Sequence, residues 1–461
     1  MWKFFLWSFL GVLLCIGCNS VPSKTHWPEV RPLGQEFKTY QAPETEYVSL
    51  PEAFQEPTDS LTLAQALSYT LLRHPELIQF ALEIRAKEAA TLQASLFPNP
   101  EMSLEVEDFG GRDNLKGFKG SETTLQISQL FPLGGKIDAQ TQVASLEQDL
   151  SAWDYEAKRL EILTQSTKAF LNVLESQEQL KLSEEKLILA QQIFKIISAK
   201  VEAGKVAPVE GNRAKIPLAE SEFGVTQAQQ NLQSSRKRLS VFWGNWEPHF
   251  STVLGDFYQI QGLPLEKELF KHLADHPEIA RFSVEKEKYQ SILKWENAKS
   301  IPDLRVDAGV RYSNAEESQS FMLGVSVPLP LFDRNQGAIS EARHRFSQVQ
   351  AKESAIKLKL LSELSEYYQE LANAYQEILS LKEIRLPQAE TSFKAVSAGY
   401  QQGKFSYLEI LDTQSILFEM KSKYIEALKK YHRSLAEIEF RIAKKIPRSN
   451  EKPQLTKGTN S

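Results

Sequence analysis

The feature that most constrains the fold is a stretch of 65 residues, 136–200, that contains neither glycine nor proline. These two residues are the ones that most often interrupt a helix. Apolar side chains recur in the stretch in alternating steps of four and three residues, at Leu146, Leu150, Trp153, Ala157 and Leu160. This heptad-like spacing predicts one continuous helix that spans roughly 100 Å. Because a compact domain has no room for such a helix, the pattern indicates a coiled coil or an extended helical barrel.

The organisation of this region occurs twice in the chain. Four short motifs recur in the same order about 200 residues apart: 70–90 and 271–291, 96–108 and 300–312, 127–139 and 325–339, and 203–215 and 402–414. Four matches in order indicate a tandem duplication rather than chance. We therefore expect a first structural repeat over 61–243, a linker or equatorial segment over 244–262, and a second repeat over 263–446. The long helix of the second repeat is expected over about 338–399, with a kink at Pro387.

Each repeat contains two segments in which apolar and polar residues alternate, which predicts β-strands. The expected strands cover about 101–108, 122–131, 303–312 and 319–328. In the first of them, Met102, Leu104 and Val106 alternate with polar residues. A length of about ten residues is also what a tilted strand needs to cross a bilayer. The pattern alone leaves two interpretations open, namely a half-buried soluble sheet and part of a membrane barrel.

The membrane interpretation requires more than one chain. Four strands cannot close a barrel, and an open sheet edge leaves backbone groups that lipid cannot satisfy. Several chains would therefore have to share one barrel, and rotational symmetry is the natural way to close it. The polar faces of the strands carry many charges, which disfavours a buried core and favours this interpretation.

A proline-containing junction follows each strand pair and leads into the long helix. The junction at 127–139 has Gly134 and Gly135 where the junction at 325–339 has Asp333 and Asn335. Prolines at such positions let the chain leave a sheet without an unpaired ladder donor. We expect the two junctions to turn differently.

The N-terminal segment indicates export. Lys3 precedes an apolar run over 4–14, and Gly17 precedes Cys18, which resembles a bacterial lipoprotein signal with cleavage after residue 17 and acylation (palmitate) of Cys18. Cys15 stands where such signals usually have leucine, so an ordinary signal peptide stays open. These are the chain's two cysteines, which excludes a disulfide framework. We expect an extended segment over 18–60, a disordered tail over 447–461 and no transmembrane helix.

With these features in place, the chain resembles the TolC-type outer-membrane efflux proteins over about 61–446. The motif "VSVPLPLFDRNQGAI" at 325–339 resembles most the heavy-metal branch, the outer-membrane component of cobalt–zinc–cadmium and copper–silver exporters. The resemblance implies a mainly α fold with a transmembrane β part. It implies a homotrimer whose twelve-stranded barrel takes four strands from each chain and stands on an α-helical periplasmic tunnel. It also implies two partners, a periplasmic adaptor (membrane fusion) protein and an inner-membrane pump of the resistance–nodulation–division type.

The resemblance also suggests functional residues. In the barrel, charged side chains would face the lumen: Glu101, Glu105, Glu107, Arg305, Asp307 and Arg311. Simple solvation of a wide lumen is the alternative for each of them. In "AGYQQGKFSYLEILDTQ", the family pattern makes Tyr400, Glu409 and Asp412 a periplasmic gate. Arg213 could pair with an Asp of a neighbouring hairpin and hold the gate shut.

The turns between helices would be the tips that dock the adaptor. They are Gly204, Lys205 and Val206 in the first repeat and Gly403, Lys404 and Phe405 in the second. A glycine is expected at a helix end that needs a left-handed residue. Phe405 stands where some relatives have a basic residue, which suggests that the contacts that hold the gate shut are organised differently here.

No motif in the sequence indicates an enzyme, a cofactor or a nucleic-acid partner. The spacing of His272 and His276 could suit a metal, but Pro277 follows directly and the first repeat has only His74, so we expect a structural role. The family resemblance therefore implies a passive exit duct for heavy-metal cations in the outer membrane. The same duct for drugs or for type I protein secretion is one alternative, and a trimeric coiled-coil structural lipoprotein is another.

Overall fold

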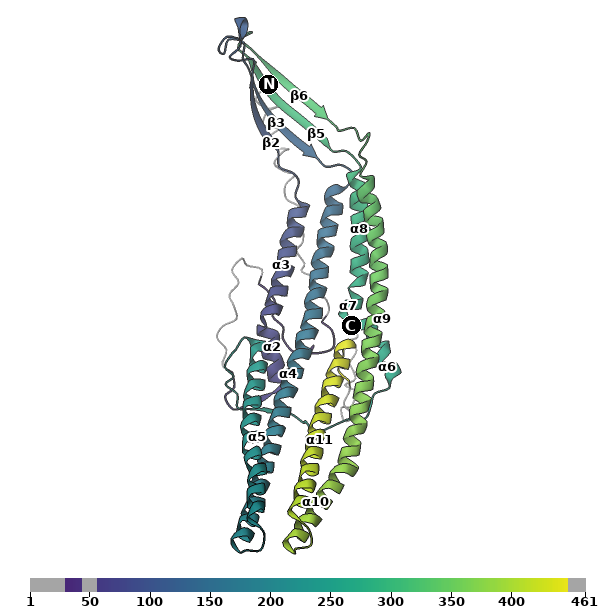
Figure 1. The fold of residues 1–461 in the computed structure, drawn as a ribbon. Helices are drawn as coiled ribbons and strands as arrows, with labels where there is room; N and C mark the ends of the chain where they lie inside the picture. Colours follow the sequence, from purple (N-terminus) through teal and green to yellow (C-terminus); the bar gives the residue numbers. More distant parts are fainter. Residues whose placement is uncertain (1–29, 44–55, 447–461) are drawn as a thin grey trace, which may run out of the picture. The chain divides into compact units, whose positions relative to one another are not determined.

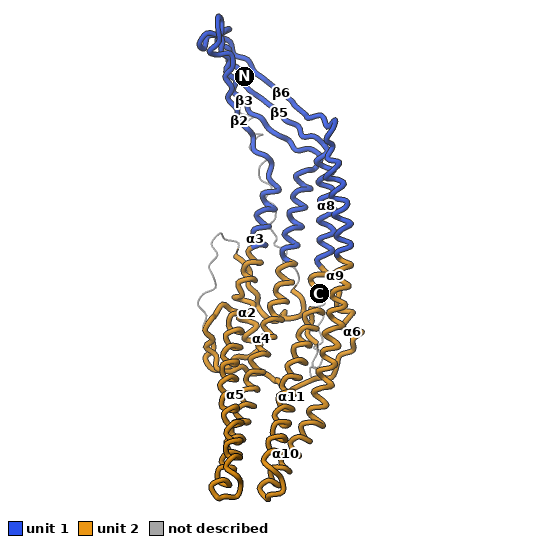
Figure 2. The backbone as a smooth tube through the Cα atoms, in the orientation of Figure 1, with its two compact units in different colours: residues 1–28, 83–152, 281–352 blue, residues 29–82, 153–280, 353–461 orange. Residues whose placement is uncertain are grey.

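The computed structural model describes residues 30–43 and 56–446, which form two compact units (Figure 2). Unit 1 takes its described residues from 83–152 and 281–352, and unit 2 takes the rest. Three helices contribute to both units: α3 (Pro75–Ser95), α4 (Lys136–Glu202) and α9 (Gln336–Ser380). The expected signal segment 1–17, Cys18 and the tail 447–461 lie outside the described residues.

Unit 1 contains a four-stranded antiparallel sheet (Figure 1). Its strands are β2 (Glu101–Glu107), β3 (Glu122–Phe131), β5 (Leu304–Ser313) and β6 (Ser318–Ser326), in the order β2-β3-β5-β6. The hairpin of each repeat stays intact, and the two hairpins join through β3 and β5. Helix α8 (Phe282–Lys299) and the unit 1 parts of α3, α4 and α9 complete the unit.

The register separates the two faces of this sheet by chemistry. Directly opposed residues share a face, so one row runs Leu104, Leu125, Val310, Phe321 and the next runs Met102, Ile127, Ala308, Leu323. Met102 is 76% exposed and both Phe321 and Leu323 are 80% exposed. The described part of the chain leaves this apolar face uncovered, so the interpretation as a half-buried soluble sheet is wrong.

The two strand-to-helix junctions agree at one residue and differ at the residue before it. Gly135 and Asn335 both have positive φ, 71° and 60°, and their carbonyls accept the first helical N–H bonds of α4 and α9. The Asn335 side chain donates to Glu296 Oε2 at 2.7 Å, which holds this non-glycine residue in the left-handed region. Gly134 has a φ of 73° and faces Ile301, where a side chain would collide, and residue 334 has no such conformation. The expected difference therefore lies at Gly134 alone.

Unit 2 is built from helical hairpins around one apolar core. Its elements are α2 (Leu63–Arg73), α5 (Pro208–Ser240), α6 (Glu266–Lys271), α7 (Pro277–Ala280), α10 (Leu386–Gln401), α11 (Tyr407–Arg441) and a parallel pair of β1 (Ser60–Thr62) with β4 (Thr252–Leu254). The core takes fully buried side chains from both repeats, among them Phe170, Leu239, Leu364 and Leu428, and Phe250 from the segment between them. The duplicated halves therefore fold around a shared core rather than as separate domains.

The second long helix is not continuous, which corrects the expected helix over 338–399. Helix α9 ends at Ser380, a π-helical turn covers Leu381–Arg385, and α10 begins at Leu386. Pro387 lacks an N–H, and its ring would meet the carbonyl four residues earlier in a regular helix. A wider turn before the proline removes that clash, so the interruption precedes Pro387. None of the described helices is both long and apolar enough to cross a membrane.

Candidate gate, hairpin turns and charged sheet face

The two hairpin turns of unit 2 have the same backbone geometry. Gly204 and Gly403 have φ values of 68° and 78°. The N–H of Lys205 donates to the Lys200 carbonyl and that of Lys404 to the Gly399 carbonyl, both at 2.8 Å. This is the Schellman arrangement, in which a left-handed glycine ends the helix. A Cβ on either glycine would meet nothing within 4 Å, so backbone conformation alone requires glycine there.

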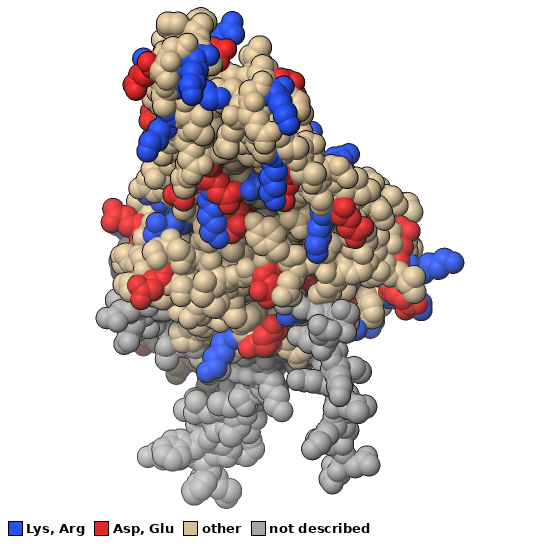
Figure 3. All heavy atoms as spheres, turned by 90° about the horizontal axis from the view of Figure 1, so that it is seen from below, with Lys and Arg blue, Asp and Glu red and all other residues tan. Residues whose placement is uncertain are grey.

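Five of the six residues expected at the tips are exposed, and Val206 is half-buried. Phe405 covers Gly399, where any side chain would collide with its ring. It therefore packs on its own turn. Figure 3 shows the molecule from below, where basic and acidic side chains are interspersed and neither sign forms a continuous patch.

A small apolar cluster joins the two hairpins near these turns. It contains Ile193 and Ile197 of α4, Ala214 of α5, Tyr400 of α10, and Tyr407 and Ile410 of α11. The Lys200 ammonium lies 3.7 Å from the centre of the Tyr400 ring and donates a hydrogen bond of 3.2 Å to the Tyr400 carbonyl. A cation over an aromatic face is attracted by the ring quadrupole. Lys200 thus fastens the first hairpin to the second.

Tyr400 is an interior residue of this cluster. It is 5% exposed, and its hydroxyl has no hydrogen-bond partner among the described residues. Burial, with a smaller contribution from the charge of Glu210, raises the pKa of Tyr400. The same causes, together with Tyr400 itself, raise the pKa of Tyr407 to about 12. In the single chain, Tyr400 therefore belongs to the hairpin contact and does not face an Asp or Glu at hydrogen-bonding distance.

Glu409 begins helix α11 as half of a capping box. Its Oε2 accepts the backbone N–H of Ser406 at 2.7 Å and the Ser406 hydroxyl at 2.8 Å, and the Ser406 Oγ accepts the Glu409 N–H at 3.4 Å. The backbone bond, followed by the hydroxyl bond, lowers the pKa of Glu409. The spacing of serine and glutamate is a known signature of a helix start, and this signal in the sequence was missed.

Asp412 and Arg213 are exposed and form no ion pair within the described part of the chain. Asp412 lies one turn after Glu409 on α11, and Arg213 lies on α5. The structure thus brings Tyr400 into the hairpin contact but does not join Arg213 to Asp412 within one chain.

The six charged residues expected in a lumen share the polar face of the sheet. The register places Glu101, Glu105 and Glu107 of β2 on the same face as Arg305, Asp307 and Arg311 of β5. Arg305 lies 3.2 Å from Glu101, and the Ser128 hydroxyl donates to Asp307 at 2.6 Å.

A seventh charged residue, Glu122, was missed by sequence reasoning. It lies opposite Glu107 on this face and 3.0 Å from Arg311. The alternation of its strand carries the signal that would have found it. With Glu122, five carboxylates and two guanidiniums occupy the face, which leaves three excess negative charges for each chain.

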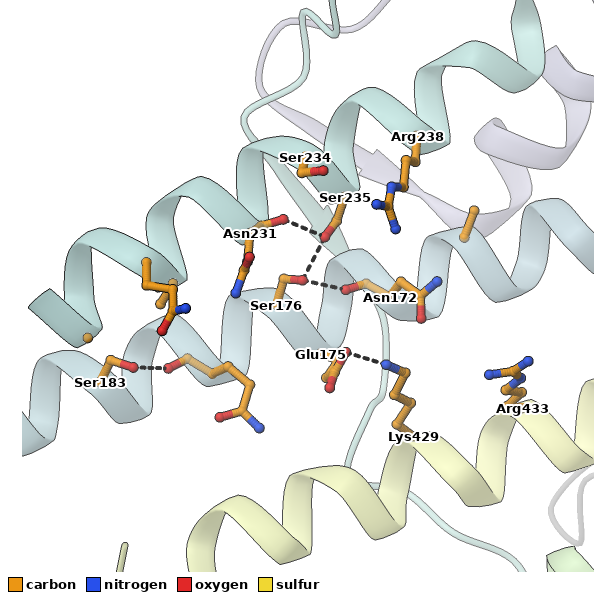
Figure 4. Close-up of a pocket in the computed structure, with 15 residues that line it drawn as sticks. Asn172, Glu175, Ser176, Ser183, Asn231, Ser234, Ser235, Arg238, Lys429 and Arg433 are labelled. Carbon is orange, nitrogen blue, oxygen red and sulfur yellow. Dashed lines mark hydrogen bonds and ion pairs between the residues drawn. The ribbon is translucent and has the colours of Figure 1, made fainter. Parts of the chain in front are cut away.

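A polar groove lies along α4 in unit 2, between α5 and α11 (Figure 4). It encloses about 620 Å³ and is lined mainly by hydroxyl and amide side chains. The Ser176 and Ser235 hydroxyls meet at 2.7 Å across α4 and α5, and Lys429 pairs with Glu175 at 2.7 Å. These bonds tie the walls of the groove together.

His272 and His276 of the second repeat do not form a metal site. His272 is directed to Asp275, 3.5 Å away, whereas His276 is buried against the Phe440 ring. Burial, followed by the charges of Arg441 and Arg31, lowers the pKa of His276 to about 4. Nowhere in 30–43 or 56–446 do three His, Cys, Asp or Glu side chains come together in a way that could hold a metal ion.

Duplicated helical hairpins that carry a four-stranded sheet with one apolar and one charged face define an outer-membrane channel of the TolC type. The solved structure of CusC matches with a TM-score of 0.70 at 16% identity, over 88% of this chain and 99% of that one. The outer-membrane protein VceC from Vibrio cholerae matches with a TM-score of 0.68 at 17% identity, over 83% of this chain and 96% of that one.

The model of the outer membrane efflux protein family matches residues 66–245 and 270–442, and the chain belongs to this family. The two matched ranges confirm the predicted duplication. The protein is the outer-membrane channel of a tripartite efflux system, a transport protein and not an enzyme. This assignment sets aside the alternative of a structural coiled-coil lipoprotein.

Two similar proteins are metal resistance proteins by name. The chain is 31% identical over 373 residues to the cobalt-zinc-cadmium resistance protein CzcC of Cupriavidus metallidurans, which covers 81% of this chain and 88% of that protein. It is 24% identical over 308 residues to the nickel-cobalt-cadmium resistance protein NccC of Alcaligenes xylosoxydans xylosoxydans, over 67% and 69% of the two chains.

Proposed function

We propose that this chain forms a homotrimer that serves as a passive exit duct for heavy-metal cations. The observation that carries the proposal is the sheet, in which two apolar rows and a charged face run in register across all four strands. An apolar face without a cover suits lipid, and the charged face suits a water-filled lumen. The free edges at β2 and β6 require neighbours, and three chains would give a barrel of twelve strands.

The proposed cargo rests on the relatives and on charge. By name, CzcC is a cobalt-zinc-cadmium resistance protein and NccC is a nickel-cobalt-cadmium resistance protein. Three excess negative charges per chain, multiplied by three, would favour cations near the lumen wall, although salt screens this preference beyond about 8 Å. The competing proposal is the same duct for drugs or for type I protein secretion, because an exit channel needs little selectivity of its own.

The gate and the partners belong to the same proposal. Tyr400, Glu409, Asp412 and Arg213 would control the periplasmic end, with Arg213 and Asp412 free to pair between neighbouring chains. Their exposure in the single chain supports that pairing. The matched turns at Gly204–Val206 and Gly403–Phe405 would dock the periplasmic adaptor, which in turn binds an inner-membrane pump of the resistance–nodulation–division type. Acylated Cys18 would anchor the chain in the outer membrane.

Deletion of the gene tests the cargo. The deletion strain is exposed to zinc, cobalt, cadmium, nickel, copper, silver and common drugs. We expect tolerance to divalent metals to fall and to return when the gene is restored. Lost drug tolerance with unchanged metal tolerance would overturn the metal assignment. Purified protein is then placed in planar bilayers, where trimers with a stable conductance are expected and a monomer without conductance would refute the duct itself.

A further inference from the structure

The turn that joins β2 to β3, residues 108–121, displays two aromatic rings to solvent. Phe109 and Phe118 stack with ring centres 5.7 Å apart and planes 9° from parallel. They are 56% and 67% exposed. A loop that keeps two stacked phenyl rings in water loses the stabilisation that burial would give them. Exposed apolar groups of this kind mark contact surfaces.

The conformation of this turn is fixed by its own hydrogen bonds. The Gly110 N–H donates to the Gly117 carbonyl at 2.7 Å, and the Gly111 N–H donates to the Leu115 carbonyl at 3.0 Å. Leu115 also fills the space in which side chains at Gly111 and Gly120 would lie. The rings are therefore presented by an ordered scaffold.

A residue of the neighbouring β5–β6 turn secures the end of this scaffold. The Asn314 side-chain amide donates to the Phe118 carbonyl at 3.1 Å and to the Ser121 hydroxyl oxygen at 2.6 Å. The carbonyl of one of the two stacked aromatic residues is thus held from the second repeat. A preorganised surface loses little entropy when it binds.

The turn that carries the aromatic pair also carries three cationic side chains. Arg112, Lys116 and Lys119 are exposed and make no ion pair in the described part of the chain. The acidic residues of the turn, Asp108 and Asp113, both have a φ of 55°, and neither pairs with these cations. A surface with two phenyl rings and three free cations suits a ligand that has acyl chains and phosphates together.

We propose that the 108–121 turn binds the phosphorylated glycolipid of the outer leaflet of the outer membrane. The inference rests on the proposed function, in which the sheet crosses this membrane and the turn, at the end of the strands away from the helices (Figure 1), reaches the cell surface. The cations contact the glycolipid phosphates, and the two rings lie at the level of the upper acyl chains. A second copy of the turn is a poorer occupant, since three cations would face three cations across the contact.

The test uses the full chain in detergent and lipid A as the probe. Native mass spectrometry measures the apparent affinity for lipid A and for its fully dephosphorylated form at low salt. The test variant replaces Arg112, Lys116 and Lys119 with serine. The matched control replaces Lys186, Lys195 and Lys215 with serine. These lysines are also exposed and form no ion pair among the described residues, so both variants lose the same charge.

We expect the loop variant to lose about a hundredfold in affinity for lipid A, from a contribution of three cations near an anionic surface, and the control to lose none. The double variant Phe109→Ser and Phe118→Ser should lower the affinity for lipid A and for its dephosphorylated form by the same factor. The inference is overturned if the loop variant matches the control, if dephosphorylated lipid A binds as well as lipid A, or if the loop variant changes the oligomeric state. Conductance of the loop variant in bilayers separates failure of this inference from failure of the duct.

Discussion

The contact between Lys200 and Tyr400 makes a quantitative prediction about the hairpin turns. Lys200→Met keeps the length of the side chain and removes its charge. The change abolishes the cation–ring contact of 3.7 Å and the hydrogen bond of 3.2 Å to the Tyr400 carbonyl. A partly exposed cation–ring contact contributes about 0.5–1 kcal/mol, and a hydrogen bond from a charged donor contributes about 1.5 kcal/mol before screening by solvent. We expect a net loss of about 1–2 kcal/mol.

Amide hydrogen exchange measures this loss where it acts. The N–H groups of Lys205 and Lys404 each close a turn within its own hairpin, and we expect both turns to open more often once the contact between the hairpins is lost. A loss of 1–2 kcal/mol corresponds to exchange that is about fivefold to thirtyfold faster at these amides. Core amides of unit 2, for example that of Leu428, should keep their rates.

Two controls make the result specific. Lys195→Met removes an exposed lysine of the same helix that forms no ion pair or cation–ring contact among the described residues, and it should leave both turns unchanged. In a double-mutant cycle with Tyr400→Leu, the coupling energy should be about 1 kcal/mol. Equal exchange in Lys200→Met and Lys195→Met, or additive effects in the cycle, would refute the reasoning.

Three further predictions follow from single positions. Gly403→Ala should destabilise unit 2 by about 1–2 kcal/mol in thermal unfolding, because its φ of 78° strains any residue with a Cβ; Gly262→Ala is the control, since Gly262 has neither a positive φ nor a close neighbour. Phe321→Arg should destabilise the folded barrel by about 2–4 kcal/mol, the cost of a cation that faces lipid, and should therefore lower the amount of heat-resistant trimer in the outer membrane. Ser320→Arg on the other face of the sheet should be tolerated. His276 has a pKa of about 4 against an ordinary 6.5. The folded state favours the neutral imidazole, and the unfolded chain takes up the proton first. The free energy of unfolding should therefore fall by about 1.4 kcal/mol per pH unit as the pH drops from 6.5 to 4. His276→Leu should remove this part of the pH dependence in urea titrations.

The elements that the sequence predicted well are those whose signal is local. The heptad-like pattern of 136–200, which no glycine or proline interrupts, correctly predicted α4. The alternation of apolar and polar residues located the four strands, because successive residues of a strand point to opposite faces of the sheet. The contact between Lys200 and Tyr400 joins residues 200 positions apart, and no periodicity reports on it. The π-helical turn was missed for another reason, since the clash at Pro387 is relieved in the turn before the proline. The Arg213–Asp412 pair was inferred from position within a motif, which does not fix the partner of an exposed side chain.

The two repeats share the geometry of their turns and differ in where their helices are interrupted. Gly204 and Gly403 close equivalent turns with equivalent bonds, and Gly135 and Asn335 begin equivalent helices. In the first hairpin, however, α4 is one uninterrupted helix, whereas in the second a π-helical turn directly precedes α10. Bending is easier where the hydrogen-bond ladder is already irregular, so we expect the second hairpin to bend at its π-helical turn and the first at Pro217 inside α5. Since Tyr400 lies on α10 and Lys200 on α4, any such movement must first break the contact between them.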